Sequence, residues 1–465
     1  MSRKSRRVLS VFTLTMITIG SVDSIRNLPS TALFGSSLIF FFLLAAVFFL
    51  IPSALISAEL SSTWPEQGGV YVWVKKAFGS RAGYFAIWFQ WIENIIWYPT
   101  ILSFIAATLA FIINPQLASQ PWFLVAVILT TFWGITFINF FGMQSSGWVS
   151  NICSVTGLIL PMTLIISLGA IWIIGRHHLQ IHFTKEAMLP HLHYASVWVS
   201  LTGIMLSFSG MEIATVHARD VKNPQSAFPR ALFLSATIIL ITLVLGSLAI
   251  AIVLPNAKIS LVAGIMQAFS AFFQAYHLHW LIPFVAILLI IGGIGGVNNW
   301  LIAPTKGLLV AAQDDHLPSI FTKENRHYAP VALLVGQAIV VSVLSLFFLF
   351  LPSVNESYWM LNALASQLYM FMYILMFAAG IYLRFKYPTK KRPYKIPGGN
   401  IGMLIVGSMG IIAAILTIVV GFFPPASLHI HNIPDYVIIL TITLVVMSSP
   451  PLITAYFKKL RSRKK

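Results

Sequence analysis

Three carboxylates lie within stretches of the chain that are otherwise apolar enough to cross a membrane: Asp23, Glu93 and Glu212. A charged side chain at the bilayer centre costs about 3 kcal/mol or more, so such residues usually mark the path of a solute or a proton. Asp23 and Glu212 each follow shortly after a glycine, Gly20 and Gly210, and a glycine weakens a helix. This spacing predicts two polar sites at interruptions of membrane helices.

The composition indicates an integral membrane protein. Of 465 residues, 58% are hydrophobic and 9% are charged. Residues 94–175 contain no Asp, Glu, Lys or Arg over 82 positions, and residues 259–305 contain none over 47. No water-soluble domain keeps its surface that free of charge. The apolar runs show no alternation with period two, so they predict helices rather than strands of a membrane barrel.

Polar breaks divide the chain into twelve predicted transmembrane helices, each with roughly 20 apolar residues or more. The predicted spans are 9–33, 36–60, 83–112, 122–141, 148–175, 195–217, 230–254, 278–311, 330–351, 358–384, 400–422 and 434–457. We therefore expect an all-α integral membrane protein with a single transmembrane domain over residues 1–465.

Lys and Arg are distributed unevenly between the two sides of these spans. With the N-terminus inside, the inner loops and termini hold 25 of the 29 Lys and Arg residues, and the outer loops hold three. The remaining one, Arg26, lies within a span. By the positive-inside rule both termini are cytoplasmic. The net charge of +17 therefore favours contact with anionic lipid over binding of nucleic acid.

The two interruptions lie five spans apart. The first comprises Thr18, Ile19, Gly20, Ser21, Val22, Asp23 and Ser24, and the second comprises Ser207, Phe208, Ser209, Gly210, Met211 and Glu212. This arrangement is typical of two inverted five-helix repeats whose first helices are unwound at the midplane. Unwound backbone offers N–H groups to a carboxylate and carbonyl groups to an ammonium, and an amino acid carries both. A kink or a packing contact is the alternative for either glycine alone.

Several stretches resemble the amino acid–polyamine–organocation (APC) superfamily. They are residues 58–60 with 64–74, residues 209–212 with 220–224 and 229–231, and Trp300 with 311–318. Within that superfamily the chain is most similar to the bacterial glutamate/GABA antiporter group, a similarity that residues 396–399 and 421–425 extend to the last helices.

The resemblance implies a LeuT-type 5+5 inverted repeat, about 9–175 and 195–384, with two additional C-terminal helices at about 400–457. It also implies alternating access in the cell (inner) membrane and exchange of an amino acid for a related counter-substrate. The expected partners are these two solutes and the lipid bilayer, with the protein a monomer or a homodimer. No metal or cofactor is expected.

The resemblance also assigns site residues. It places substrate on the backbone of Thr18–Asp23 and Phe208–Met211, and on the side chains of Asn94 and Trp300. Tyr369 corresponds to a tyrosine that helps to close the cavity.

Three residues depart from the pattern of the relatives. Arg26 falls where the glutamate/GABA antiporter carries an aromatic residue, and Glu93 falls where an arginine exchanger has a glycine. Asn151 occupies the position of a lysine found in several proton-coupled members, so proton coupling through that position is not expected.

Each charged residue within the spans has a structural alternative to a role in gating or proton sensing. Asp23 and Arg26 are three residues apart, so they form either an internal ion pair or a pair that opens to take the amine and the carboxylate of a substrate. Glu212 is either a proton-sensing carboxyl or a hydrogen-bond acceptor that ties its helix to neighbouring helices. Glu93 either attracts a cationic substrate or pairs with a Lys or Arg that the sequence does not identify.

The cysteine and the histidines of the outer loop predict no further reactive or metal-binding site. Cys153 is the only cysteine, which excludes an internal disulfide and predicts a buried, inert thiol. The outer loop 176–195 contains His177, His178, His182, His191 and His193. Loop spacing alone does not bring metal ligands together, so a solvated loop is favoured over a pH-responsive one or a metal site.

The favoured function is secondary-active amino acid transport, by glutamate/GABA-like antiport of a zwitterionic or acidic amino acid for a related amine. One alternative is exchange of cationic amino acids or amines, motivated by Asp23 and Glu93 with only Arg26 opposing them. Another is proton-coupled uptake. A channel or solute sensor on the same fold is a different class, and a membrane-embedded enzyme would need partners for His277 and His279. No Walker-type motif supports direct driving by ATP.

Overall fold

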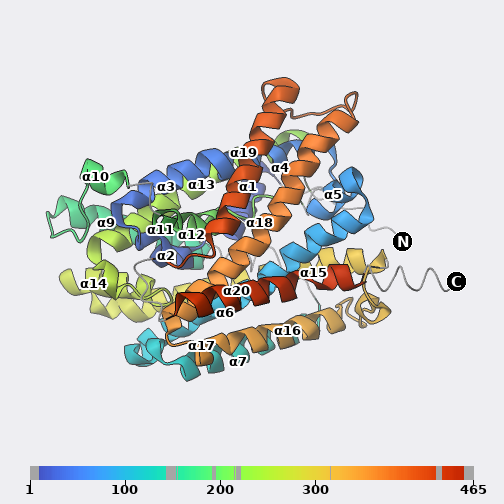
Figure 1. The fold of residues 1–465 in the computed structure, drawn as a ribbon. Helices are drawn as coiled ribbons and strands as arrows, with labels where there is room; N and C mark the ends of the chain where they lie inside the picture. Colours follow the sequence, from blue (N-terminus) through green and yellow to red (C-terminus); the bar gives the residue numbers. More distant parts are fainter. Residues whose placement is uncertain are drawn as a thin grey trace.

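The computed structural model describes residues 10–66, 68–142, 153, 155–190, 195–213, 215, 221, 223–314, 316–425 and 432–454. These parts of the chain form a bundle of helices and contain no β-strand (Figure 1). The prediction of an all-α protein is confirmed.

The helices up to residue 190 are α1 (Val11–Val22), η1 (Ile25–Asn27), α2 (Leu28–Ala32), η2 (Gly35–Ser37), α3 (Leu38–Ala45), η3 (Ala46–Leu50), α4 (Ile51–Thr63), α5 (Val70–Phe78), α6 (Ser80–Ile113), η4 (Pro115–Ser119), α7 (Pro121–Asn139), η5 (Val155–Ile159), α9 (Leu160–Ile174) and α10 (Lys185–Met188). Those after it are α11 (Ala195–Trp198), α12 (Ser200–Ser207), α13 (Pro224–Val253), η7 (Asn256–Lys258), α14 (Gly264–Ala275), η8 (His279–Leu281), α15 (Ile282–Gln313), η9 (Ser319–Thr322), α16 (Val331–Ser345), α17 (Phe347–Phe350), α18 (Val354–Lys386), α19 (Gly399–Val420) and α20 (Ile433–Ser448).

Ten helical segments of the described chain are long and apolar enough to cross a membrane. They are Gly35–Thr63, Ser80–Ile113, Pro121–Asn139, Val155–Ile174, Gln225–Val253, His279–Asn298, Val331–Phe350, Val354–Lys386, Gly399–Val420 and Ile433–Thr454. The predicted spans that are missing from this set are the first and the sixth, 9–33 and 195–217. Both are divided into short helices, since α1 has 12 residues and α12 has eight. The count of twelve and the 5+5 arrangement remain predictions.

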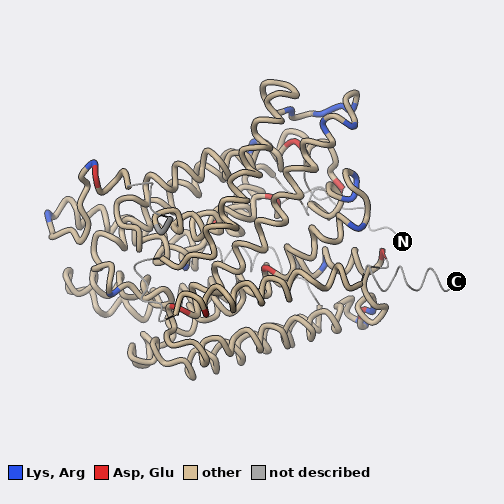
Figure 2. The backbone as a smooth tube through the Cα atoms, in the orientation of Figure 1, with Lys and Arg blue, Asp and Glu red and all other residues tan. Residues whose placement is uncertain are grey.

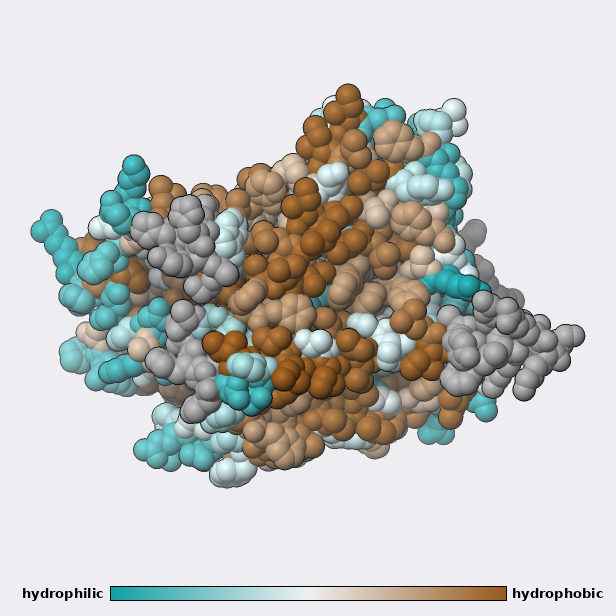
Figure 3. Space-filling view, viewed as in Figure 1, coloured by the Kyte–Doolittle hydropathy of each residue, from teal (hydrophilic) through white to brown (hydrophobic). Residues whose placement is uncertain are grey.

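The surface of the bundle is apolar around its middle. Figure 3 shows a broad hydrophobic band between two ends that are more hydrophilic. Ile412 of α19 and Val445 of α20 belong to the exposed apolar side chains and are 62% and 61% exposed. Side chains of this kind are stable in contact with lipid, because lipid offers them the apolar surroundings that a soluble protein finds only in its core.

Most of the described Lys and Arg residues lie at one end of the bundle. Figure 2 shows them gathered around α5 and around the connection between α18 and α19, with few at the opposite end. This is the end that the positive-inside rule assigns to the cytoplasm. The orientation in the membrane remains a prediction.

A buried ion cluster holds this end together. Glu59 of α4 pairs with Arg384 of α18 and with Arg392, whose Nε lies 3.1 Å from Glu59 Oε1. The backbone N–H of Ile396 also donates to Glu59, and Arg384 donates to the carbonyl of Gly399 at 2.8 Å. Glu59 and Arg384 are almost completely buried, so the cluster fastens α4 to both sides of the α18–α19 connection.

A second, exposed contact at the same end joins α5 to the C-terminal end of α15. Asp314 Oδ2 accepts hydrogen bonds from Lys75 Nζ at 2.6 Å and from the hydroxyl of Tyr71. The bond from Lys75, followed by that from Tyr71, holds the pKa of the Asp314 carboxyl below its usual value. A carboxyl with a depressed folded-state pKa stabilises the fold above its unfolded pKa, and this contribution is lost as pH falls through the folded pKa.

We expect Asp314→Asn to lower the free energy of unfolding by less than about 1 kcal/mol near neutral pH, because the Lys75 and Asp314 side chains are 42% and 37% exposed. The difference between variant and parent should be constant from about pH 5 to 8 and should shrink as pH falls below about 4, first through the unfolded-state pKa and then through the lower folded-state pKa. Thermal unfolding of the detergent-solubilised proteins across this range measures it. A difference that already disappears near pH 6 would show that another group controls this contact.

Candidate functional site

The first helix interruption lies at Asp23 and Ser24. Helix α1 ends at Val22, the next two residues are extended, and η1 and α2 continue the chain. Gly20, the glycine that indicated this interruption, is itself helical, because the helical bonding continues up to the bond from Asp23 N–H to the Ile19 carbonyl at 2.8 Å. The predicted interruption is present within its predicted bounds, and it lies at the last two of these residues rather than at Gly20, since one glycine alone does not end a helix.

The second interruption begins where α12 ends, at Ser207. Residues 208–212 form turns, and Gly210 has a φ of 112°, a conformation that L-residues with a side chain rarely adopt. The Gly210 N–H donates to the hydroxyl of Tyr373 on α18 at 2.7 Å. This bond gives a partner to the Gly210 N–H, which lies beyond the end of α12 and makes no helical hydrogen bond.

The two interruptions touch one another. A Cβ atom placed on Gly210 would lie 3.3 Å from Val22 Cγ2, at the end of α1, and 3.4 Å from Trp300 Cη2 of α15. Glycine at position 210 therefore permits the second interruption to lie directly against the first and against the indole ring.

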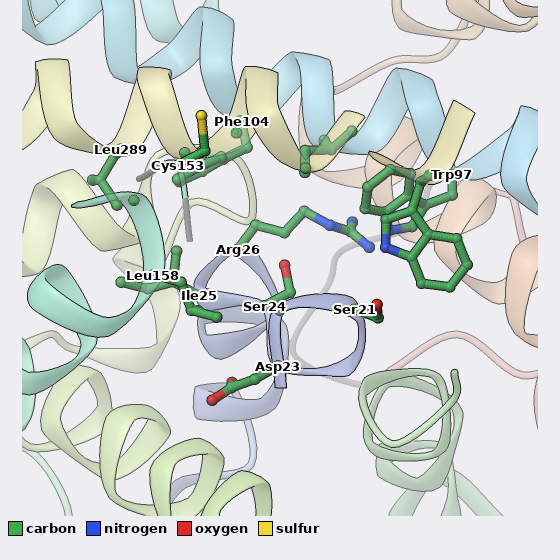
Figure 4. Close-up of a pocket in the computed structure, with 17 residues that line it drawn as sticks. Ser21, Asp23, Ser24, Ile25, Arg26, Trp97, Phe104, Cys153, Leu158 and Leu289 are labelled. Atoms are coloured by element: carbon green, nitrogen blue, oxygen red, sulfur yellow. The ribbon is translucent and has the colours of Figure 1, made fainter. Parts of the chain in front are cut away.

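A cavity lies beside the first interruption (Figure 4). Its lining residues are Gly20, Ser21, Asp23, Ser24, Ile25, Arg26, Trp97, Ile101, Phe104, Cys153, Gly157, Leu158, Leu289, Gly292, Gly293, Gly296 and Trp300. The space between them, counted together with the open solvent at its mouth, is about 610 Å³. Cys153 is only half-buried and lines this cavity, so the prediction of a buried thiol is wrong.

Asp23 and Arg26 do not pair, so the predicted ion pair is wrong. Figure 4 shows the Asp23 carboxylate and the Arg26 guanidinium pointing in opposite directions. Asp23 Oδ2 accepts a hydrogen bond from Thr242 of α13 at 2.7 Å. The physical reason is that the helix ends between Val22 and Asp23, and residues three apart share a face only where the helix continues.

Arg26 instead extends toward α6. Its Nη1 donates to Thr100 Oγ1 at 2.7 Å and to the hydroxyl of Tyr358 at 3.1 Å. The guanidinium lies 5.1 Å from the ring centre of Trp97, and Nε has no hydrogen-bond partner among the described residues.

Glu93 lies on α6, the helix that also carries Thr100 and Trp97. It accepts a hydrogen bond from Asn94 Nδ2 at 3.2 Å and interacts electrostatically with Arg26, without a direct ion pair. Arg26 is thus the cationic side chain that acts on Glu93, and the predicted alternatives for Glu93, pairing or attraction of a cationic substrate, remain predictions.

Glu212 joins the second interruption to α6 and α18. Its carboxylate accepts hydrogen bonds from Gln90 Nε2 at 2.9 Å, from the Tyr369 hydroxyl at 2.7 Å and from the Tyr373 hydroxyl at 2.6 Å. The structural alternative for Glu212 is therefore confirmed, while a role in proton sensing remains a prediction.

With this geometry in view, comparison with known proteins identifies the family. The model of the family described as "Amino acid permease" matches residues 9–446. The chain belongs to the amino acid permease family. The permease is 46% identical over 429 residues to an uncharacterized transporter of Legionella pneumophila, which covers 92% of each chain.

Two further relatives carry functional names. A glutamate/gamma-aminobutyrate antiporter of Lactococcus lactis strain IL1403 is 30% identical over 455 residues, 97% of the permease and 90% of the relative. A probable agmatine/putrescine antiporter of the same strain is 24% identical over 422 residues, 89% and 88% of the two chains. These matches confirm the resemblance to the APC superfamily and its glutamate/GABA antiporter group. The permease is a multi-pass membrane protein, and these relatives are transporters rather than enzymes.

The permease places its predicted substrate-binding residues in two groups. Those that line the cavity are Gly20, Ser21, Asp23 and Trp300. Those buried around the interruptions, outside the described lining, are Thr18, Ile19, Val22, Asn94, Phe208, Ser209, Gly210 and Met211. Asn94 is directed at the Gln90 carbonyl and at Glu93, and Tyr369 contacts Glu212. Asn151, His191 and His193 lie outside the described residues.

Several residues of the site are missing from the sequence-based set. Trp97 and Thr100 follow Glu93 by four and seven residues, and Tyr373 follows Tyr369 by four. These spacings place each residue on the same helix face as the residue that was predicted. Helical periodicity from Glu93 and Tyr369 could therefore have found all three.

The described histidines form no metal site. Among the residues that the structure describes, no group of three His, Cys, Asp or Glu side chains could hold a metal ion. His177 stacks on Trp172 with ring centres 4.3 Å apart. This contact explains the position of one outer-loop histidine without a ligand.

We expect Glu212→Gln to flatten the pH dependence of transport, because glutamine keeps the size of the side chain and one of its two acceptor oxygens but cannot exchange a proton. Uptake by the reconstituted permease between about pH 5 and 8 measures it. Tyr369→Phe is the matched control, since it removes one bond to Glu212 and leaves the carboxyl in place. An unchanged pH profile at a normal rate in Glu212→Gln would restrict Glu212 to a structural role.

Proposed function

We propose that the permease is a secondary-active antiporter that exchanges amino acids, or an amino acid for a related amine, by alternating access. The observation that carries this proposal is the contact of the two helix interruptions beside the cavity, where Gly210 lies against Val22 and Trp300. Interrupted helices that meet in the middle of a membrane protein provide backbone groups for a charged solute, and their ends can move without unfolding a complete helix.

The lining supplies complementary groups for an amino acid. The last carbonyls of α1 have no partner within the helix and carry partial negative charge, which suits an ammonium group. Gly20 and Ser21 lie at this helix end and line the cavity. The buried guanidinium of Arg26 suits a carboxylate, and the indole of Trp300 forms an apolar wall.

We assign the remaining predicted residues to the parts of the site that rearrange during transport. The backbone of Thr18–Asp23 and Phe208–Met211 forms the two interruptions, and Asn94 belongs to the α6 segment between them. Arg26, Glu93, Glu212 and Tyr369 form a gating set that connects α6 and α18 to both interruptions. The proposed setting is the inner membrane, with both termini in the cytoplasm and the protein a monomer or a homodimer.

For the substrate we propose glutamate/GABA-like exchange, which the antiporters of Lactococcus lactis at 30% identity support. The second candidate is exchange of cationic amino acids or amines. The similarity to a probable agmatine/putrescine antiporter and the buried carboxylate of Glu93 support it.

Counterflow in proteoliposomes tests the proposal. Vesicles containing the purified permease are preloaded with single unlabelled amino acids or amines, and entry of labelled L-glutamate, 4-aminobutyrate, L-arginine, agmatine or putrescine is followed at several pH values. We expect saturable entry that depends on the internal solute. Entry without dependence on the internal solute would indicate uniport, proton-coupled uptake or a channel, and no entry of any solute would refute the proposal.

A further inference from the structure

We propose that Arg26 is a carboxylate anchor that makes the permease select substrates bearing a carboxylate over diamines. This inference rests on the proposed function and names the substrate class of the same cavity.

Arg26 lies in the cavity wall with hydrogen-bonding capacity left over. It is 1% exposed, and its side-chain hydrogen bonds to the described residues go from Nη1 to the neutral hydroxyls of Thr100 and Tyr358. Nε has no partner among the described residues. A guanidinium has five N–H donors in a planar fork that matches a carboxylate, so a bound carboxylate can use donors that the protein leaves free.

The acidic side chains around Arg26 do not neutralise it by direct contact. Asp23 points away and is bonded to Thr242. Glu93 acts on Arg26 through space and accepts a bond from Asn94, and Glu212 is occupied by its three donors on α6 and α18. A buried charge without a contacting counter-ion is unfavourable, so an anionic group of a substrate gains free energy there.

Trp97 restricts how a ligand approaches. The guanidinium lies 5.1 Å from the centre of the Trp97 ring, and the rings of Trp97 and Trp300 are 5.9 Å apart. The two indoles form one wall of the cavity and hold the cation in place. A carboxylate at Arg26 would leave its carbon chain against this wall.

The free carbonyl groups at the C-terminal end of α1 carry partial negative charge, which is opposite in sign to the charge of the Arg26 guanidinium. A ligand with its carboxylate at Arg26 and its ammonium at this helix end satisfies both. A diamine would leave the guanidinium unpaired and bring a like charge toward it. Selection therefore includes a repulsive contribution as well as an attractive one.

Cys153 allows the charge of the cavity to be measured without any transport assay. It is the only cysteine of the chain and lines the same cavity as Arg26. In purified full-length protein we compare its rates of modification by the anionic reagent 2-sulfonatoethyl methanethiosulfonate and by the cationic 2-(trimethylammonium)ethyl methanethiosulfonate. We expect the anionic-to-cationic rate ratio to fall about tenfold in Arg26→Gln and to be retained in Arg26→Lys.

Two other variants make this result specific. Arg81→Gln removes a cation from an exposed position outside the cavity and should leave the ratio unchanged. Glu93→Gln removes the carboxylate that acts on Arg26 and should raise it. If the anionic-to-cationic rate ratio of Arg26→Gln equals that of the parent, while Arg26→Lys shows that a variant at this position folds, the proposal is overturned.

Protection of Cys153 by ligands tests selectivity. L-Glutamate should slow modification of the parent at lower concentrations than putrescine does, and Arg26→Gln should need about tenfold more glutamate for the same protection. Equal protection by putrescine and glutamate in the parent would refute the anchor while leaving an amine exchanger possible. If the parent instead exchanges no amino acid or amine in counterflow, the proposed function fails, and the reagent ratio still reports separately on Arg26.

Discussion

Replacing Arg384 with alanine should destabilise the folded permease by about 3–5 kcal/mol, since it leaves a buried carboxylate without its main partner. Glu59 is buried in contact with Arg384 and Arg392, and the Arg384 guanidinium also binds the Gly399 carbonyl. Removal of the Arg384 guanidinium takes a partner from the Glu59 carboxylate and from the Gly399 carbonyl, and Glu59 is only 1% exposed. This is among the most damaging single changes that the described contacts predict.

Thermal unfolding of the purified variants in detergent measures this effect, with yield of monodisperse protein as a second measurement. Lys386→Ala is the matched control on the same helix, because Lys386 is exposed and its Nζ donates to the Lys76 carbonyl at 3.2 Å. An Arg384→Ala variant as stable as Lys386→Ala would mean that water or Arg392 replaces the lost contact completely.

The Gly292→Ala variant should lose nearly all transport, while Gly296→Ala should retain it. A Cβ atom on Gly292 would lie 2.1 Å from the Gly157 Cα atom, so the two helical segments contact each other through their backbones. Forcing them apart costs about 1–3 kcal/mol or more and changes the shape of the cavity that both glycines line. A Cβ atom on Gly296 meets no atom within 4 Å.

This pair of variants separates crowding from a general effect of alanine, because both glycines belong to α15 and both line the cavity. Counterflow in proteoliposomes with equal amounts of protein measures transport, and thermal unfolding measures stability. Normal transport by Gly292→Ala would mean that the segments separate easily and that their close approach has no role in the transport cycle.

Helix α6 connects the two interruptions. Gln90 contacts Glu212 beside the second interruption, and Thr100 contacts Arg26 beside the first. Glu93 lies between them on the same helix and interacts electrostatically with both Arg26 and Glu212. A change of charge or position at one interruption can therefore reach the other through one continuous helix, as the proposed exchange cycle requires.

Local sequence patterns were sufficient for the elements of the fold and for part of the cavity. Apolar runs about 20 residues long specify membrane helices, because the backbone must satisfy its own hydrogen bonds in lipid. The matching glycines at 20 and 210 indicated that two of these helices are interrupted, and Trp300 was found through resemblance to a family.

The sequence by itself determined that the chain is an all-α membrane protein with two interrupted helices carrying acidic residues. Only the tertiary structure decided which partners those residues have: Asp23 with Thr242, Arg26 with Thr100 and Tyr358, and Glu212 with Gln90 and two tyrosines. The physical reason is that hydropathy and helix periodicity act over neighbouring residues, whereas a side chain at the end of a helix takes its direction from groups that are distant in the sequence. Where the helix ends at Val22, the spacing rule that predicted an Asp23–Arg26 pair no longer applies, and packing against α6 and α13 determines the site.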